Sequence, residues 1–290
     1  MYNMYKYTQN GAVNVKRIAI IPNHTKDKNY EYTKRLCRFL NGKAHIVMQA
    51  GTPAIEGAEY TAGSVYDGAD AVIILGGDGT MLQAAEPCGE SGIPVMGINL
   101  GKVGFMTEVE TADMESACRK LLDDDYTVEN RMMMEVCVNF ADGGTCTHIA
   151  LNDVVVYKPG ARMLEMELYA NAEKVSEYMA DGLIISTPTG STGYSLSAGG
   201  PVADPTVELF IATPICAHTL SARPMLLSEK KLINLRLTEK GCENAAVTVD
   251  GEDRCIIGLK DTVTVRKSNR YLKIIKLGKQ SFYHTMMAKL

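Results

Sequence analysis

Short apolar runs alternate with amphipathic stretches through the first part of the chain. Strands of the buried type are predicted at Arg17 to Pro22, His45 to Met48, Ala71 to Leu75 and Pro94 to Leu100. Apolar residues recur at helical spacing over Lys26 to Leu40 and Glu110 to Leu122. Because buried strands that alternate with helices form a parallel sheet covered on both faces, this part is predicted to be an α/β domain.

The pattern changes near Tyr126, beyond which strand-like segments dominate. They lie at Met132 to Phe140, His148 to Tyr157, Glu165 to Ala170, Leu183 to Thr187, Leu232 to Leu237, Ala246 to Val249, Thr262 to Arg266 and Tyr271 to Lys276. Turn signals at Asp142-Gly143-Gly144 and Asn171-Ala172-Glu173 predict hairpins. We therefore predict an α/β N-terminal domain with a parallel sheet over residues 1–126 and a β-rich C-terminal domain over residues 127–276. A closing helix within residues 277–290 is expected to pack back on the first domain.

Composition and charge exclude several classes of protein. Thirty Lys and Arg against 34 Asp and Glu give a net charge of −4 without runs of one sign, so a basic nucleic-acid-binding face is not expected. No segment approaches the roughly 18 apolar residues of a membrane helix, and the N-terminal residues lack the apolar stretch of a signal peptide. The eight cysteines are scattered without a CxxC pair, and the five histidines form no HExxH pair. These residues therefore predict no metal-ligating site. We expect a cytoplasmic protein that binds neither nucleic acid nor membrane.

A glycine-rich turn, Gly76-Gly77-Asp78-Gly79-Thr80, follows the predicted strand Ala71 to Leu75 and precedes apolar positions of helical spacing. Glycines let the backbone approach a bulky anion, and the amides at a helix N-terminus favour negative charge. Neither GxxxxGK[ST] nor GxGxxG occurs. A carboxylate at Asp78 could accept the proton of an attacking hydroxyl or hold a magnesium ion beside phosphates. The alternative is an ordinary turn in which Asp78 is a solvated cap.

A second polar segment runs from Ser186 to Ser197. Its hydroxyl residues are Ser186, Thr187, Thr189, Ser191, Thr192, Ser195 and Ser197. Neutral donors and acceptors suit a ligand of sugars and pyrophosphate, and Tyr194 could stack on an aromatic ring of such a ligand. The alternative is that Ser and Thr gather here because loops favour them. Asp153 and Asp250-Gly251 can equally be turn residues.

Two of these segments resemble known kinases. Gly76 to Thr80 resembles an element shared by NAD kinases, diacylglycerol and sphingosine kinases and, less closely, phosphofructokinases. The segment from Asp181 to Pro201 resembles the long signature of NAD kinases, and this match decides among them. Supporting elements occur in family order at Gly97 to Phe105, Asn152-Asp153, Thr213 to His218, Arg223-Pro224 and Asp250-Gly251.

The resemblance implies transfer of a phosphoryl group from ATP to the adenosine 2′-hydroxyl of NAD, giving NADP and ADP. It implies a nucleotide-binding α/β domain, an NAD-binding β-rich domain, a divalent metal ion, with Mg²⁺ expected, and assembly as a homodimer or homotetramer. Asp78 would be the catalytic acid–base residue, beside a phosphate loop of Gly76, Gly77, Gly79 and Thr80. The remaining binding residues would be Asn152 and Asp153 for the adenosine end, Arg162 for a phosphate, Asp181 for the nicotinamide end in its own or a neighbouring subunit, and Thr189, Thr192, Gly193, Tyr194, Ser195, Leu196, Ser197 and Asp250 for the dinucleotide.

Three positions depart from the family pattern. Asp153 stands where Glu is usual, which shortens the carboxylate arm by one methylene; Gly193 stands where Ala is usual, and Ala217 where Pro is usual. None removes a group that the reaction requires. A lipid kinase and a catalytically inactive NAD-binding sensor are the alternatives. The sequence shows no apolar entrance or basic membrane-facing patch for the first, and the intact glycine turn with Asp78 argues against the second.

Overall fold

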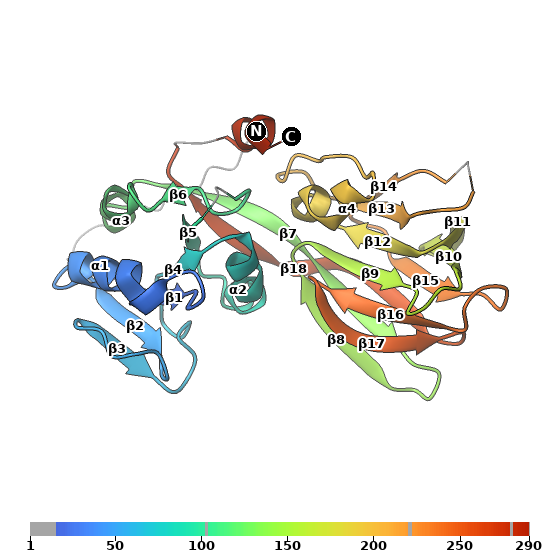
Figure 1. The fold of residues 1–290 in the computed structure, drawn as a ribbon, viewed down its shortest axis with the longest axis horizontal. Helices are drawn as coiled ribbons and strands as arrows, with labels where there is room; N and C mark the ends of the chain where they lie inside the picture. Colours follow the sequence, from blue (N-terminus) through green and yellow to red (C-terminus); the bar gives the residue numbers. More distant parts are fainter. Residues whose placement is uncertain (1–15, 102–103, 220–221, 279–280, 290) are drawn as a thin grey trace. The chain divides into compact units, whose positions relative to one another are not determined.

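The computed structural model of the protein describes residues 16–101, 104–219, 222–278 and 281–289 (Figure 1). The chain forms two compact units, one from residues 1–130 and 272–290 and the other from residues 131–271. Two long strands, β7 (Thr127–Asn139) and β18 (Thr262–Lys276), contribute residues to both units.

The first unit is built on a parallel sheet. Its strands follow the order β5-β4-β1-β2-β3, all paired in parallel, and the end of β18 joins β5 through the pair Ile274 and Val95. The strands are β1 (Arg17–Pro22), β2 (His45–Gln49), β3 (Ala58–Thr61), β4 (Ala71–Gly76), β5 (Val95–Asn99) and the short β6 (Val109–Glu110). Every residue of β4 and β5 is buried, as expected for central strands covered on both faces.

Helices of the first unit are α1 (Glu31–Leu40), α2 (Asp78–Ser91) and α3 (Met114–Leu122), preceded by the 3₁₀ turn η1 (Lys28–Tyr30). The prediction of a helix from Lys26 was wrong at its start, because Asn29 and Tyr30 have φ values of 56° and end the 3₁₀ turn before α1 begins. The predicted start of the helix at Glu110 was also too early, since α3 begins at Met114.

The C-terminal helix α5 (Phe282–Lys289) belongs to the first unit. Its Phe282 ring lies 5.8 Å, centroid to centroid, from the ring of Phe105, and the ammonium group of Lys289 lies 4.6 Å from the same ring. These contacts confirm that the C-terminal segment packs back on the first domain.

The second unit is β-rich. One antiparallel sheet has the order β14-β13-β12-β9-β16-β17. The other strands pair as β11-β10-β15-β18 and β8-β7. The bounds are β8 (Thr145–Ala150), β9 (Asp153–Tyr157), β10 (Leu164–Ala170), β11 (Glu173–Ala180), β12 (Gly182–Ser186), β13 (Leu209–Ile215), β14 (Met225–Ser228), β15 (Ile233–Leu237), β16 (Asn244–Val249) and β17 (Glu252–Gly258), with the short helices η2 (Thr189–Thr192) and α4 (Tyr194–Ser197). The hairpins predicted at Asp142-Gly143-Gly144 and Asn171-Ala172-Glu173 are confirmed, joining β7 to β8 and β10 to β11.

The prediction of one strand from His148 to Tyr157 was wrong. The chain leaves β8 after Ala150 and enters β9 at Asp153, and the two strands belong to different sheets. The backbone groups of Leu151 and Asn152 bond to side chains and to a loop instead of a strand ladder, which breaks the strand at this point. The polar pair Asn152-Asp153 interrupts the apolar run at this point, and it was the available signal for the break.

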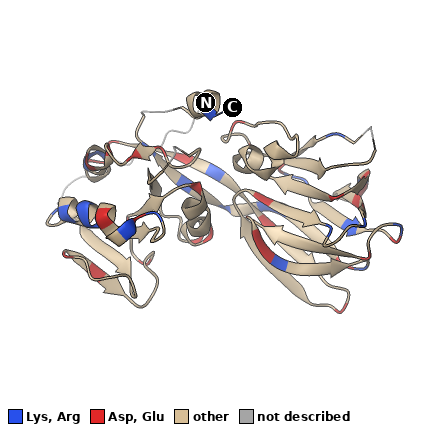
Figure 2. Cartoon of the chain, in the orientation of Figure 1, with Lys and Arg blue, Asp and Glu red and all other residues tan. Residues whose placement is uncertain are grey.

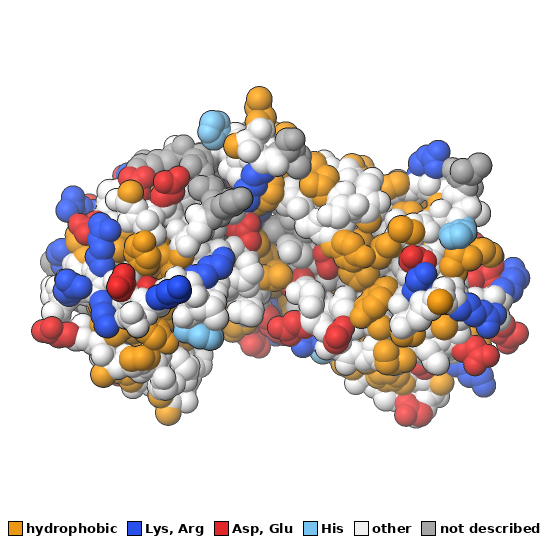
Figure 3. All heavy atoms as spheres, in the orientation of Figure 1, with side chains coloured by type: hydrophobic (Ala, Val, Ile, Leu, Met, Phe, Trp, Pro, Cys, Tyr) orange, Lys and Arg blue, Asp and Glu red, His pale blue; other side chains and the backbone are white. Residues whose placement is uncertain are grey.

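Charged side chains of both signs are interspersed along the elements (Figure 2), and a space-filling view shows the same mixture on the face that it presents (Figure 3). Among the helices that the structure describes, none has the length and apolar character needed to cross a bilayer.

Candidate active site

The glycine turn lies where β4 ends and α2 begins. Gly76 ends the strand, Gly77 caps the helix, and Asp78 is the first helical residue. A Cβ atom on Gly76 would lie 2.2 Å from Oγ1 of Thr80, so this position has no room for a larger residue. The first-turn amides of a helix lack partners within the helix, and here they lie at the carboxyl edge of a parallel sheet, where nucleotides bind in α/β proteins.

The carboxylate of Asp78 is half-buried and held in a fixed orientation. Its Oδ2 accepts a hydrogen bond from the N–H of Phe105 at 2.7 Å. Its Oδ1 accepts from the N–H groups of Met106 at 3.1 Å and Thr107 at 3.2 Å, and from the Thr107 hydroxyl at 3.2 Å. A Cβ atom on Gly104 would lie 1.9 Å from Oδ1, so this close approach requires glycine. Because a carboxylate oxygen has two lone pairs, Oδ2 can still accept a bond from a substrate hydroxyl.

Asn23, which the sequence analysis missed, stabilises the turn. Its N–H donates to the carbonyl of Leu75 at 2.8 Å, and its Nδ2 donates to Oγ1 of Thr80 at 2.8 Å. The residue lies 57 positions from Thr80, beyond any local motif. The available signal was a polar residue directly after β1, because the carboxyl ends of adjacent parallel strands meet at one edge of a sheet.

In the second unit, Asn152-Asp153 and the polar loop emerge at the same end of a strand pair. Asp153 begins β9 and pairs with Ser186, the last residue of β12. Thr187 donates from its N–H to the carbonyl of Asn152 at 2.8 Å and from its hydroxyl to the carbonyl of Leu151 at 2.5 Å. The structure therefore brings together two segments that are about 35 residues apart and that were predicted separately.

We call the meeting point of Asn152, Asp153 and the polar loop (residues 186–197) the Asn152 junction. Asp250 stabilises it from the turn between β16 and β17. Its Oδ2 accepts from the N–H of Leu151 at 2.8 Å, and its Oδ1 accepts from the N–H groups of Asn152 at 2.8 Å and Asp153 at 3.1 Å. Its own N–H donates to the carbonyl of Asp153 at 2.9 Å. Asp250 thus shapes the turn through backbone contacts, and its direct contact with a ligand stays a prediction.

Several buried polar atoms at this junction have no hydrogen-bond partner within the described residues: Oδ1 of Asn152, Oγ of Ser186 and Oγ1 of Thr189. Gly193 lies beside them, since its Cβ position would be 3.9 Å from Nδ2 of Asn152 and 4.0 Å from Oδ2 of Asp153. An unsatisfied buried polar group costs about 1–3 kcal/mol. A polar ligand that bonds to these atoms would remove that cost.

Burial raises the pKa values of the two carboxyl groups at the junction, Asp153 and Asp250. Asp153 is 6% exposed, and burial together with the charge of Asp250 raises its pKa from 3.8 to about 7. Burial also raises the pKa of Asp250, although the three backbone N–H donors and Arg254 oppose the rise. Near neutral pH, Asp153 is therefore partly protonated and its hydroxyl form can donate a hydrogen bond.

This raised pKa predicts a pH-dependent stability. Between pH 3.8 and about 7 the folded state binds the Asp153 proton more tightly than the unfolded state, so the contribution of Asp153 to stability falls as pH rises through this window. The change is at most about 4 kcal/mol. We expect Asp153→Asn to gain stability relative to the parent as pH increases from 5 to 8, measured by denaturant unfolding. Asp123→Asn, an exposed carboxylate, is the control, and parallel curves for Asp153→Asn and the parent would contradict the raised pKa.

The remaining residues of the polar loop divide into inward and outward groups. Ser195 is buried, and its hydroxyl lies 2.9 Å from that of Thr213, which anchors α4 on β13. Thr192 bonds back to the carbonyl of Thr189 at 3.4 Å. Tyr194 is 49% exposed and Ser197 is exposed, while Leu196 is half-buried. Stacking of Tyr194 on a ring therefore stays a prediction that its exposure allows, whereas the Ser195 hydroxyl is occupied in holding the helix.

Two predicted site residues lie elsewhere in the second unit. Asp181 precedes β12 at the end opposite Ser186, about 17 Å away along the strand direction. It forms an ion pair with Lys158 at 2.5 Å. Arg162 is exposed and donates to the carbonyl of Lys240 at 3.3 Å. The structure of one chain does not bring either residue to the Asn152 junction.

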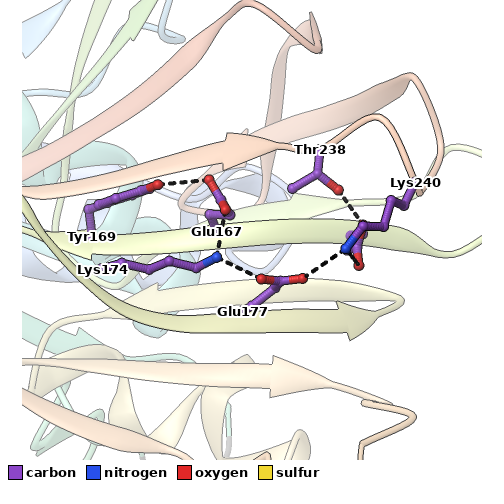
Figure 4. A network of polar contacts seen from close by, with 7 residues as sticks. Glu167, Tyr169, Lys174, Glu177, Thr238 and Lys240 are labelled. Carbon is purple, nitrogen blue, oxygen red and sulfur yellow. Dashed lines mark hydrogen bonds and ion pairs between the residues drawn. The ribbon is translucent and has the colours of Figure 1, made fainter.

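A polar network near Arg162 joins β10, β11 and the segment after β15 (Figure 4). Lys174 lies 2.6 Å from a carboxylate oxygen of Glu167 and 2.6 Å from one of Glu177, and Lys240 lies 3.6 Å from Glu177. These contacts raise the pKa of Lys174 and lower the pKa values of Glu167 and Glu177. Opposite charges are paired throughout, so the network links neighbouring strands.

No three His, Cys, Asp or Glu side chains of the described residues are grouped so that they could hold a metal ion.

Comparisons with known proteins agree with the two-part organisation. Residues 18–126 match the model of the ATP-NAD kinase N-terminal domain, and residues 151–277 match that of the ATP-NAD kinase C-terminal domain. The chain is 37% identical over 281 residues to an NAD kinase of Caldanaerobacter subterraneus, with 95% of this chain and 99% of that protein covered.

Solved structures show the same fold. A yeast NADH kinase in complex with NADH superposes with a TM-score of 0.82 at 20% identity, covering 94% of this chain and 86% of that one. An NAD kinase from Archaeoglobus fulgidus in complex with ATP gives a TM-score of 0.68 at 26% identity, covering 94% and 98%. Both domain models match, and the 37% identity extends over nearly the full length of the chain. The chain therefore belongs to the ATP-NAD kinase family.

Proposed function

We propose that this protein phosphorylates the 2′-hydroxyl of the adenosine ribose of NAD with ATP, giving NADP and ADP. Its membership of the ATP-NAD kinase family supports the activity. The observation that carries the mechanism is the position of Asp78, the first residue of the helix that follows the glycine turn. Its carboxylate is held by the backbone N–H groups of residues 105–107. A base fixed beside an anion-binding turn is what transfer of a phosphoryl group to an alcohol requires.

In the proposed reaction, Oδ2 of Asp78 accepts the proton of the 2′-hydroxyl as that oxygen bonds to the γ-phosphorus of ATP. The bond from the γ-phosphorus to the bridging oxygen of the β-phosphate breaks, and ADP leaves. The amides at the start of α2 lie where negative charge accumulates on the phosphates. Positioning and charge neutralisation supply most of the rate enhancement in such transfers.

NAD recognition is proposed to use the junction of Asn152, Asp153 and the polar loop. The unpaired oxygens of Asn152, Ser186 and Thr189 offer directional contacts to a base and a ribose. Asp153, partly protonated near neutral pH, can donate to or accept from a ribose hydroxyl. Tyr194, exposed on α4, is placed to stack on a ring of the dinucleotide.

The finer features of the proposal concern the metal, assembly and location. A divalent ion, Mg²⁺ in our proposal, enters on the phosphate oxygens of ATP as part of the substrate. Asp181 is proposed to act on the nicotinamide end from a neighbouring copy in a homodimer or homotetramer, because within one chain it lies at the far end of β12 from Ser186. All eight cysteines are free, which supports a cytoplasmic location.

The test is to incubate the purified protein with ATP, Mg²⁺ and NAD and to detect NADP with a dehydrogenase that uses only NADP. A parallel reaction replaces NAD by diacylglycerol in detergent micelles. We expect NADP to form in step with ADP and no phosphorylated lipid. Lipid phosphorylation without NADP would establish a lipid kinase instead, and NAD binding without turnover would establish a sensor.

A further inference from the structure

A lysine far from the glycine turn in sequence lies directly beside it in the fold. The Nζ atom of Lys26 would be 2.8 Å from a Cβ atom built on Gly77, the residue that caps α2. Lys26 is exposed and precedes the turn by about 50 residues. The glycine turn contains no basic residue, so this ammonium group gives it a positive charge that local sequence does not show.

The backbone that carries Lys26 is tied to the same turn. Asn23, already bonded to Leu75 and Thr80, accepts at Oδ1 from the N–H of Thr25 at 3.0 Å and from that of Lys26 at 3.1 Å. The carbonyl of Asn23 accepts from the N–H of Asp27 at 2.8 Å. The position of Lys26 next to Gly77 therefore follows from a fixed tight turn at its backbone, and only the side chain can move.

Within the described residues, the ammonium group of Lys26 has no carboxylate partner. The neighbouring Asp27 is fully buried, and its carboxylate accepts from the N–H groups of Tyr32 at 3.0 Å and Thr33 at 2.9 Å. The Asp78 carboxylate is directed to the backbone of residues 105–107. A cation beside free helix amides, with the nearby acids committed elsewhere, favours a phosphate ligand.

We propose that Lys26 binds the phosphates of the ATP donor at Gly77, together with the amides at the start of α2. The proposal rests on the function proposed above and adds a substrate-binding residue to it. The transferred phosphoryl group must reach Asp78, and Gly77 belongs to the same turn as Asp78. The Lys26 ammonium group beside Gly77 is therefore expected to contact the phosphates of ATP and not the pyrophosphate of NAD.

The test measures binding of ATP and of a non-hydrolysable ATP analogue, each with Mg²⁺, by calorimetry, so its result does not depend on NADP formation. Lys26→Gln is expected to weaken both by roughly 10- to 100-fold, to reduce the salt dependence of binding, and to leave NAD affinity and the unfolding midpoint unchanged. Lys26→Arg should restore most of the affinity. Lys28→Gln, which changes an exposed lysine two positions away, is the matched control and should bind ATP like the parent.

A double-mutant cycle separates a phosphate contact from a structural effect. Gly77→Ala introduces a Cβ atom against the Lys26 ammonium group, and its φ of −144° is accessible to alanine. If Lys26 binds phosphate, Gly77→Ala weakens ATP binding less in the Lys26→Gln background than in the parent. Unchanged ATP affinity in Lys26→Gln, or a loss confined to NAD, would overturn the proposal even if the parent proves to be an active NAD kinase.

Discussion

Asp78→Asn is expected to lower kcat for NADP formation by roughly 10²- to 10⁴-fold, with NAD affinity close to that of the parent. The asparagine keeps the size of the side chain and one oxygen that can accept the bonds of Met106 and Thr107. It cannot take up the proton of the 2′-hydroxyl. Steady-state kinetics with saturating ATP, together with NAD binding by calorimetry, would separate the loss of proton transfer from a loss of substrate.

Two further measurements test whether the lower kcat of Asp78→Asn comes from a loss of stability or from any loss of a carboxylate. Asn places an N–H group where Oδ2 accepts from Phe105, so a stability loss of about 1–2 kcal/mol is expected and should be measured by denaturant unfolding. Asp123→Asn removes an exposed carboxylate of the same unit and should leave kcat unchanged. Turnover of Asp78→Asn near that of the parent would exclude Asp78 as the base.

Gly190→Ala is expected to disrupt the junction that is proposed to bind NAD. A Cβ atom on Gly190 would lie 2.1 Å from the carbonyl oxygen of Asn152 and 2.6 Å from its carbonyl carbon, and these are backbone atoms that cannot turn aside. Asn152 must then shift, together with the contact from the Thr187 N–H. Displacement of a binding group by about 1 Å can cost roughly 10²-fold in activity. We expect at least that loss in kcat/KM for NAD, with a stability loss of about 1–3 kcal/mol or more.

Gly160→Ala is the matched control for this variant. Gly160 lies in the same unit, a Cβ atom there would meet no atom within 4 Å, and its backbone is not in the left-handed region. It should therefore retain the activity and stability of the parent. If Gly190→Ala also retained both, the close packing of the loop on Asn152 would not be needed for NAD binding.

The sequence predicted the features that depend on local pattern. Buried strands such as Ala71 to Leu75 were found because a central parallel strand is apolar on both faces. The glycine turn with Asp78 was found because a helix start after a buried strand has a short-range signature. The long polar loop was found through its resemblance to the family and through its density of hydroxyl groups.

Contacts between distant segments could not be predicted in the same way. Asp250 bonds to three consecutive amides about 100 residues away, and these bonds break the strand that the apolar pattern from His148 to Tyr157 predicted. Lys26 reaches Gly77 only through the adjacency of β1 and β4. Such contacts depend on strand order, which hydrophobic periodicity does not specify.

The separation of Asp181 from Ser186 along β12 has a different origin. A motif read as one continuous segment in sequence runs along a strand in the fold, so its two ends cannot meet the same small group. The resemblance supplied the idea that Asp181 acts in a neighbouring subunit, and the strand geometry is consistent with that role. Sedimentation of the purified protein would show whether such a neighbour is present.

Residue 78 is proposed to meet the 2′-hydroxyl of NAD. The most direct measurement is a crystal structure of Asp78→Asn with NAD, Mg²⁺ and a non-hydrolysable ATP analogue. We predict the 2′-oxygen within about 2.6–3.2 Å of the residue 78 side chain. A 2′-hydroxyl facing solvent, or a different hydroxyl of NAD at residue 78, would contradict the role proposed for Asp78.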